Sequence, residues 1–202
     1  KTNQKTLDKN ISNVISAVSN SAHAPILQNI KIDVVDNRVK LTASDMDISI
    51  ESSFDCDDIE SGSTTVNASI FSNVVKKYSK DSDISFLQDE SGLFKISQGR
   101  SKFKIPTLPS EDYPTISSDN LDIKFQIESS QLITAINKCL KTICKDPTRF
   151  SLNGLCVKFD SESKSLKFIS TDGVAMSFFE VENQDIDSDF NIIIPNNSIS
   201  SI

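Results

Sequence analysis

Residues 25–45 read PILQNIKIDVVDNRVKLTASD. Apolar residues alternate with polar ones on both sides of the centre of this stretch: Ile30, Ile32, Val34, Val39 and Leu41. Alternation with a period of two is typical of strands, and Asp36-Asn37 between the two runs is a turn signal. The stretch therefore predicts an antiparallel hairpin.

Outside this hairpin, four further segments show strand-like patterns: 48–54, 84–87, 93–96 and 102–105. Turn-forming residues at 89–92 join the second of these segments to the third. Pro106, Pro109 and Pro114 then interrupt the pattern, and residues 115–122 are rich in Ser, Asp and Asn. We expect a first domain at 1–114 and a linker at 115–122.

Three segments instead place apolar residues at the i, i+3, i+4, i+7 spacing of a helix. They comprise Ile11, Val14, Ile15 and Val18; Ile70, Phe71, Val74, Val75 and Tyr78; and Leu132, Ile133, Ile136, Leu140 and Ile143. The stretch 67–69 (Asn-Ala-Ser) and the serines at 129–130 offer side chains that cap a helix start. Helices combined with antiparallel strands predict an α+β fold.

The second half of the chain repeats the first. With an offset of 125, five apolar residues of the first half fall on apolar residues of the second: Ile11, Ile15, Val18, Leu27 and Ile30 on Ile136, Leu140, Ile143, Leu152 and Leu155. The offset becomes 127 at residues 41–45 and 128 at residues 66–69, so length changes fall in loops. We therefore expect a duplicated helix-plus-sheet unit whose second copy, 123–202, stops early.

Charge is sorted along the chain. The net charge is -7 and the isoelectric point is near 4.7, which argues at first against nucleic acid as a partner. However, the helical segments 1–20, 69–80 and 129–145 carry +2, +3 and +3, so the other 153 residues carry -15. Such basic helices can be ordinary solvated faces, but three of them together favour a phosphate-binding surface.

Composition excludes several classes of protein. The single histidine, His23, cannot build a two-histidine metal site, and the five glycines never cluster as a nucleotide-binding loop requires. No apolar run approaches the length of about 20 residues that a membrane helix needs, and the start of the chain lacks a secretory signal. The four cysteines have unrelated spacings, which indicates reduced thiols and a cytoplasmic protein.

Five motifs occur in order along the chain: PILQNI at 25–30, SD at 44–45, TLPSEDYP at 107–114, LNG at 152–154 and STDG at 170–173. Together they resemble the bacterial DNA polymerase sliding clamp, the beta processivity factor. The resemblance implies the DNA-clamp fold: a ring of two head-to-tail subunits with three domains each, helices lining the hole and sheets forming the outer wall. It also implies that this chain is the first domain without its first short strand, followed by a truncated second domain, and that the third domain is absent.

The resemblance further implies two sites. Residues expected to face DNA are Lys9, Lys76, Lys77, Lys80, Lys138, Lys141, Lys145, Arg149 and Phe150. Lysines contact phosphates without reading the sequence, which permits sliding while the closed ring prevents loss from DNA. Residues expected to line this domain's share of an apolar peptide groove are Leu152, Thr171, Gly173, Val174, Ala175 and Met176.

Two departures from the family pattern concern these sites. The loop from Ser19 to Ala24 lacks the arginine often found there, and Val174-Ala175 replaces the usual His-Arg after Thr-Asp-Gly. Arg149 can also be read as an ordinary loop cation, and Ala175 as a strand end. The second departure is expected to alter the rim of the groove.

The implied partners are double-stranded DNA, bound without sequence specificity, and the replicative polymerase, the clamp loader and repair polymerases, bound through short peptide motifs. A full-length subunit would also bind a second subunit. The resemblance implies a non-catalytic processivity factor in the cytoplasm, with no cofactor, metal or membrane.

Two other readings remain open from the residues. An enzyme could use paired acids such as Asp45 with Asp47 or Asp57 with Asp58, although no base or nucleophile accompanies them. Alternatively, the chain is an acidic duplicated interaction module that never encircles DNA, which fits its net charge but not its acid-free basic helices.

Overall fold

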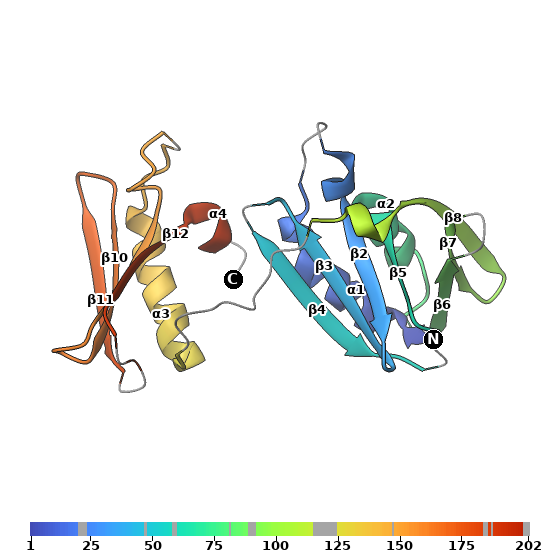
Figure 1. Cartoon of the computed structure of the whole chain (residues 1–202), viewed down its shortest axis with the longest axis horizontal. Coiled ribbons are helices and arrows are strands. Elements are labelled where there is room, and N and C mark those ends of the chain that lie inside the picture. Colours follow the sequence, from blue (N-terminus) through green and yellow to red (C-terminus); the bar gives the residue numbers. More distant parts are fainter. Residues whose placement is uncertain are drawn as a thin grey trace. The chain divides into compact units, whose positions relative to one another are not determined.

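The computed structural model describes residues 1–19, 24–46, 48–57, 60–80, 82–88, 92–114, 125–146, 148–183, 186 and 188–199. The chain divides into two compact units, residues 1–116 (unit 1) and 117–202 (unit 2), shown in Figure 1. The end of unit 1 lies two residues from the expected boundary at 114. The expected linker, 115–122, lies outside the described residues.

In the described part of unit 1, two α-helices and eight antiparallel strands form an α+β unit. The helices are α1 (Gln4–Val14) and α2 (Ala68–Lys76), with 3-10 turns η1 (Ile15–Ala17), η2 (Pro25–Gln28) and η3 (Ser110–Asp112). The strands are β1 (Thr2–Asn3), β2 (Asn29–Val35), β3 (Arg38–Ser44), β4 (Ser49–Asp55), β5 (Gly62–Asn67), β6 (Asp83–Gln88), β7 (Leu93–Gln98) and β8 (Ser101–Leu108). Their order in the sheet is β1-β6-β7-β8-β5-β2-β3-β4.

The predicted hairpin is confirmed as β2 and β3, with Val34 opposite Val39. Asp36 and Asn37 between them have φ angles of 49° and 62°. Positive φ at both central residues is the geometry of the two-residue turn that matches strand twist, and Asp and Asn tolerate it better than most residues. Local turn chemistry therefore sets this register.

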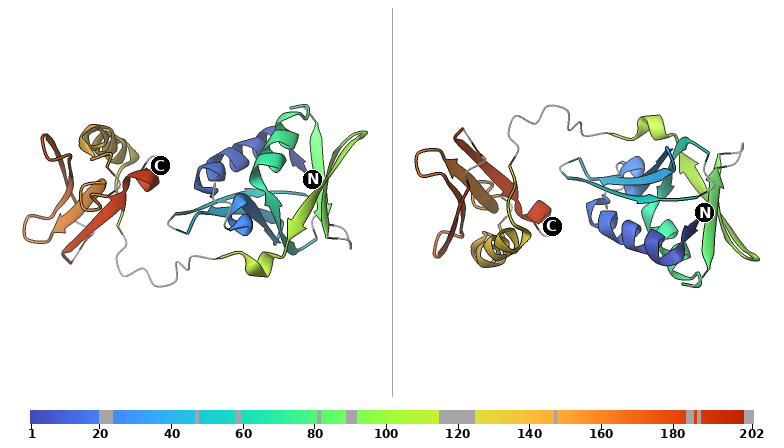
Figure 2. Two further views of the ribbon diagram at one scale, coloured as in Figure 1. Left: turned by 90° about the horizontal axis from the view of Figure 1, so that it is seen from above. Right: turned by 90° about the horizontal axis from the view of Figure 1, so that it is seen from below.

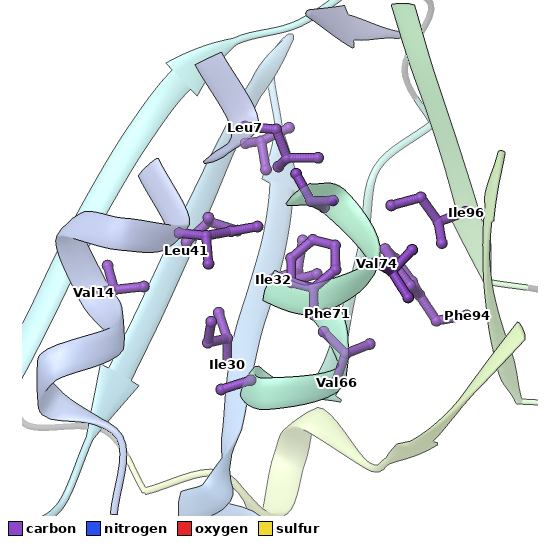
Figure 3. Packing of buried hydrophobic residues seen from close by; sticks show 14 of the residues in the cluster. Leu7, Val14, Ile30, Ile32, Leu41, Val66, Phe71, Val74, Phe94 and Ile96 are labelled. Carbon is purple, nitrogen blue, oxygen red and sulfur yellow. The ribbon is translucent and has the colours of Figure 1, made fainter. Parts of the chain in front are cut away.

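The core of unit 1 lies between the sheet and the two helices, which lie side by side (Figure 2). Figure 3 shows Phe71 of α2 amid this core, and its ring meets that of Phe94 edge to face at 5.6 Å. The side chains of Asn3 and Asn67 cap α1 and α2 by accepting from the amides of Lys5 and Ile70. The cap candidate at 67 is thus confirmed. The serines at 129–130 were wrongly predicted as caps, because they lie inside the third α-helix, whose N-cap is Glu128.

Unit 2 repeats part of this arrangement with one helix against a four-stranded sheet. Its described elements are α3 (Ser129–Cys139), η4 (Leu140–Thr142), β9 (Gly154–Asp160), β10 (Ser165–Thr171), β11 (Met176–Glu182), β12 (Phe190–Pro195) and α4 (Asn196–Ile199). The strand order is β11-β10-β9-β12. All neighbouring strands are antiparallel.

The element bounds confirm the internal repeat. An offset of 125 carries α1 onto α3, η1 onto η4 and β2 onto β9. An offset of 127 carries β3 and β4 onto β10 and β11, and an offset of 128 carries β5 and the start of α2 onto β12 and α4. The lengths of these paired strands are identical, so insertions fall only between elements.

Some predictions of secondary structure were wrong. Both long helices end early and continue as 3-10 turns, so Ile15 leaves the buried face and Lys145 lies beyond the helix that was expected to carry it. Ile133 is also exposed, and Ala135 and Cys139 face the core of unit 2 instead. A 3-10 turn advances 120° per residue and not 100°, which explains Ile15 and Lys145. Ile133 lies inside α3 and is exposed because the buried stripe of this helix runs through Leu132, Ala135, Ile136 and Cys139.

Two strands were not predicted. We expected the first domain to lack its first short strand, but the two residues of β1 pair with β6, opposite Ile84 and Asp83. Two residues are too few to show alternation. β5 lies between β2 and β8, and its threonines Thr64 and Thr65 are buried. Buried polar residues hide the period of a strand, and Val66 is the one large apolar residue of this segment, so its sequence shows no alternation.

Candidate nucleic-acid interface and peptide groove

The expected DNA-facing lysines of unit 1 are exposed at the helices. Lys9 lies on α1, Lys76 is the last residue of α2, Lys77 is its C-cap, and Lys80 follows. Cations at the end of a helix also interact favourably with the partial negative charge of its last carbonyls. Lys76 and Lys77 therefore stabilise α2 and at the same time present positive charge to solvent.

Lys138 of unit 2 lies differently from the other lysines. Its Nζ lies 4.5 Å from the ring centroid of Phe179 on β11, at cation–π distance. In unit 1 the equivalent position is Asn13, whose side chain also turns to the edge strand and donates to Oγ of Ser52 on β4. Lys141 is exposed on η4 and Lys145 is exposed after it. The three lysines therefore do not share one side of a continuous helix.

Arg149 and Phe150 lie in the loop between η4 and β9. Oδ1 of Asp146 accepts from the amide and the hydroxyl of Thr148 at 2.9 and 2.7 Å, which lowers the pKa of Asp146. The side chain of Phe150 is 82% exposed. Nη1 of Arg149 donates to the carbonyl of Asp172 at 3.3 Å. Hydrogen bonds hold the described residues of this loop, and its arginine reaches the turn between β10 and β11.

That turn, Thr171 to Met176, is held by a closed set of hydrogen bonds. Oδ1 of Asp172 accepts from the amides of Val174 and Ala175, each at 2.8 Å, and these bonds lower the pKa of Asp172. Oγ1 of Thr171 donates to the carbonyl of Ala175 at 2.7 Å. The fixed backbone leaves Val174 97% exposed and Met176 68% exposed.

Two features of this turn favour glycine at position 173. Its φ of +94° is a conformation that L side chains rarely adopt, and a Cβ there would lie 3.3 Å from Nη2 of Arg149. The same turn recurs in unit 1, where Met46 has φ +82° and Oδ1 of Asp45 accepts from the amide of Ile48 at 2.8 Å. No arginine accompanies it, because the residue equivalent to Arg149 is Ala24.

Five of the expected groove residues lie in the turn from Thr171 to Met176, and Arg149 contacts it. Leu152 is partly buried, and its carbonyl accepts a hydrogen bond from the amide of Cys144 at 3.1 Å, at the base of the loop. Arg149 was expected to face DNA with the lysines, but its guanidinium lies against Gly173. Sequence separation of more than 20 residues concealed this contact.

Sequence reasoning missed one further basic segment. Residues 93–110 contain no acidic residue and carry four cations: Lys95, Arg100, Lys102 and Lys104. They lie on the β7–β8 hairpin, where Lys95 pairs across the strands with Lys104. Counting charge by strand as well as by helix would have found this hairpin.

Other predicted residues have structural positions or cannot be placed. All four cysteines are free, and Cys56, Cys139 and Cys144 are buried. His23, Asp47 and Asp58 lie outside the described residues. Among the residues that the structure does describe, no three His, Cys, Asp or Glu side chains gather as a metal site. No helix in the described part is long and apolar enough to cross a membrane.

A family model for the DNA polymerase III beta subunit, N-terminal domain, matches residues 1–117, more than half of the chain. The chain belongs to this family. The beta sliding clamp of Haemophilus influenzae is 25% identical to it over 199 residues, which cover 97% of this chain and 53% of that protein. The beta sliding clamp of Caulobacter vibrioides (strain NA1000 / CB15N) is 33% identical over 178 residues, which cover 86% and 47%. The chain thus spans about half the length of these curated relatives.

Solved clamp structures share the fold. A beta sliding clamp from C. crescentus matches 99% of this chain and 54% of its own with a TM-score of 0.91 and 28% identity. A sliding clamp from Bartonella birtlesii, solved with griselimycin bound, matches 99% and 54% with a TM-score of 0.93 and 25% identity. The chain therefore has the DNA-clamp fold.

Proposed function

We propose that the protein acts as a sliding clamp: a non-catalytic processivity factor that encircles duplex DNA and tethers the replicative polymerase in the cytoplasm. The observation that carries this proposal is the position of the basic residues. Lys9, Lys76 and Lys77 are exposed on helices of a chain whose net charge is -7, within a fold shared with beta sliding clamps. Lysines contact phosphates without reading bases, so they suit a surface that must slide.

The proposed domain plan follows the internal repeat. Unit 1 is the first clamp domain, unit 2 is part of the second, and a third domain would complete a subunit that pairs head to tail with its copy. In that ring the helices would line the hole and the sheets would form the outer wall. A handful of phosphate contacts gives weak, salt-sensitive affinity, so retention on DNA would depend on ring closure.

The test uses the complete protein and the clamp loader of the same bacterium. The protein is loaded on nicked circular DNA, the circle is cut once, and the bound fraction is followed. We expect release within the time of cutting, and retention when bulky proteins block both ends of the cut DNA. Equal retention on open linear and circular DNA would indicate direct affinity and would overturn the ring in favour of an acidic interaction module.

The turn from Thr171 to Met176 is the proposed half of a peptide groove for the polymerase, the clamp loader and repair polymerases. Its support is an ordered backbone that presents exposed apolar side chains, Val174 and Met176, beside the guanidinium of Arg149. Preformed apolar surface with a few fixed polar groups is what short peptides bind. Val174-Ala175 makes this rim more apolar than the usual His-Arg would.

Griselimycin is bound to the Bartonella birtlesii clamp, and we propose that it also binds this protein at the groove. Overlapping peptides that tile the replicative polymerase are tested for binding to the complete protein by fluorescence anisotropy, with griselimycin as competitor. We expect one segment to bind and griselimycin to displace it. Met176→Asp should weaken that binding at least tenfold, while Leu87→Asp, which alters an exposed leucine of unit 1, should not change it. Equal affinity of both variants would refute the groove.

A further inference from the structure

Three of the five sequence motifs meet in one hydrogen-bond network of unit 1. The motif at 25–30 supplies Asn29, the motif at 44–45 supplies Ser44, and the motif at 107–114 supplies Leu108 and Tyr113. None of these residues belongs to the proposed DNA surface or to the proposed groove. The two proposed sites therefore do not explain why these motifs come together.

The hydroxyl of Tyr113 lies between the ends of two strands. It accepts from the amide of Ser44 at 2.9 Å and donates to the carbonyl of Asn29 at 3.3 Å. The paired register of β2 and β3 ends at Lys31 opposite Thr42. In an antiparallel ladder every second pair exchanges two hydrogen bonds, and counting from the two-residue turn makes Lys31 and Thr42 such a pair, so Asn29 and Ser44 would be the next. The phenol of Tyr113 therefore takes the place of one pair of the ladder.

The segment Leu108–Tyr113, which we call the strap, is also held at its start. Oγ1 of Thr65 on β5 donates to the carbonyl of Leu108 at 2.9 Å, and it accepts from Nδ2 of Asn29 at the same distance. Within the strap, the amide of Tyr113 donates to the carbonyl of Ser110 at 3.2 Å and closes η3. The strap is thus fastened to β5 at one end and to β2 and β3 at the other.

Burial makes this fastening firm. Tyr113 is 3% exposed, and Asn29, Ser44 and Thr65 are buried as well. A buried donor or acceptor that loses its partner is costly, because water does not replace the lost hydrogen bond. The network therefore resists release of the strap.

The strap lies where the chain leaves unit 1. Tyr113 comes two residues before the expected linker, 115–122, and the next described helix, α3, belongs to unit 2. Any motion that passes along the chain from one unit to the other therefore acts first on the strap.

We propose that Tyr113 is a positioning residue for ring closure, because its phenol fixes the point at which the linker leaves unit 1. In a ring that opens between its subunits, a subunit that bends more easily at its linker opens more readily. A fastened strap keeps residues 108–113 out of the part that bends, and so prolongs the time that the clamp stays on circular DNA. The inference rests on the proposed clamp function.

The experiment compares two variants of the complete protein. Tyr113→Phe removes the phenol oxygen and keeps the aromatic ring. Tyr78→Phe is the matched control, because the hydroxyl of Tyr78 is also buried in unit 1 and donates to the carbonyl of Ile96 on β7 at 3.0 Å. Thermal unfolding checks that both variants are folded and measures the stability that each one loses.

Two measurements test the proposal. Hydrogen–deuterium exchange of the strap amides should become at least about fivefold faster in Tyr113→Phe and stay unchanged in Tyr78→Phe. The residence time of the loaded clamp on nicked circular DNA should fall about two- to thirtyfold in Tyr113→Phe and stay unchanged in Tyr78→Phe.

Three results would overturn the inference. The first is unchanged exchange of the strap in Tyr113→Phe, which would show that the phenol does not hold it. The second is a residence time of Tyr113→Phe equal to that of the parent, or one that both variants shorten in proportion to their loss of stability; the clamp function would then stand and the strap would have a structural role only. The third is equal retention of the parent protein on open linear and circular DNA, which would remove the proposed ring as well.

Discussion

Gly154, the first residue of β9, is where a single methyl group should do most damage to unit 2. A Cβ at this position would lie 2.6 Å from the carbonyl oxygen of Ile194 and 2.7 Å from Cγ2 of Ile193. The oxygen belongs to the backbone of β12, opposite Gly154 and Leu155 in the sheet, so it cannot rotate away. Gly154→Ala must therefore push β12 outward.

The magnitude follows from two opposing terms. Overpacking of a tightly packed site costs about 1–3 kcal/mol. Replacing glycine by alanine also restricts the unfolded chain, which returns about 0.4–1 kcal/mol. We expect Gly154→Ala to destabilise unit 2 by about 1–2 kcal/mol, which corresponds to a roughly 5- to 30-fold increase in the population of the open state.

Hydrogen–deuterium exchange read by mass spectrometry separates the two units. Amides of β9 and β12 should exchange about tenfold faster in Gly154→Ala, while those of unit 1 keep their rates. Tyr78 and Tyr113 are the two tyrosines, and both lie in unit 1. The urea unfolding curve measured by tyrosine fluorescence should therefore be the same for Gly154→Ala as for the parent protein.

Gly62→Ala is the matched control. Gly62 begins β5, its φ is not in the left-handed region, and nothing lies within 4 Å of a built Cβ. The same substitution there should leave unit 1 as stable as before or slightly more stable. Unchanged exchange of β12 in Gly154→Ala would refute the steric argument.

Three other perturbations have definite expected results. Met46→Gly removes the backbone strain of a non-glycine residue at positive φ, which should stabilise unit 1 by about 1–2 kcal/mol. Glycine also gives the unfolded chain more conformational freedom, which offsets this gain by about 0.5–1 kcal/mol. Tyrosine-monitored unfolding should therefore show unit 1 unchanged or up to about 1 kcal/mol more stable; a clear loss would contradict the strain. Hydrogen bonds from Lys167 and nearby amides lower the pKa of Asp160 to about 2 from its usual 3.8. A carboxyl whose pKa is lower in the folded than in the unfolded protein stabilises the fold at pH values above its unfolded pKa, and this stabilisation is lost as the pH falls through its folded pKa. The difference in melting temperature between the parent and Asp160→Asn should therefore narrow between pH 4 and 2. Lys141→Gln should reduce, by about 0.9, the slope with which the logarithm of the DNA-binding constant falls against the logarithm of the salt concentration. Lys138→Gln should reduce this slope less, because the ammonium of Lys138 lies over an aromatic ring. Equal slopes for the two variants would refute this difference.

Sequence could predict those parts of the fold that local chemistry determines. Asp36-Asn37 specifies its own turn, and Asn67 specifies the start of α2, because each effect acts within a few residues. The repeat was also readable, since core positions of both units keep apolar residues at constant offsets. These signals need no knowledge of tertiary contacts.

The parts that could not be predicted depend on contacts distant in sequence. The strand β5 is central because β2 and β8 pair with it, and nothing in the Thr64-Thr65 pair shows this. The helix ends at Val14 and Cys139 tighten into 3-10 turns without a glycine or proline to signal them. Arg149 reaches the carbonyl of Asp172 only after the loop and the turn have folded, so the sequence could suggest both motifs but not their contact.

Comparison of the two units at equivalent positions separates what the fold needs from what a site needs. Most core positions of one unit fall on core positions of the other, and the paired strands have equal lengths, which indicates that packing constrains both copies alike. Three differences lie at positions that are not buried: Asn13 against Lys138, Ala24 against Arg149, and Glu51 against Phe178. The shared fold cannot explain these differences, because each unit folds with its own residue at each of these positions. Selection for different surfaces explains them more simply, and it concentrates the candidate partner-binding residues on the turn from Thr171 to Met176 in unit 2.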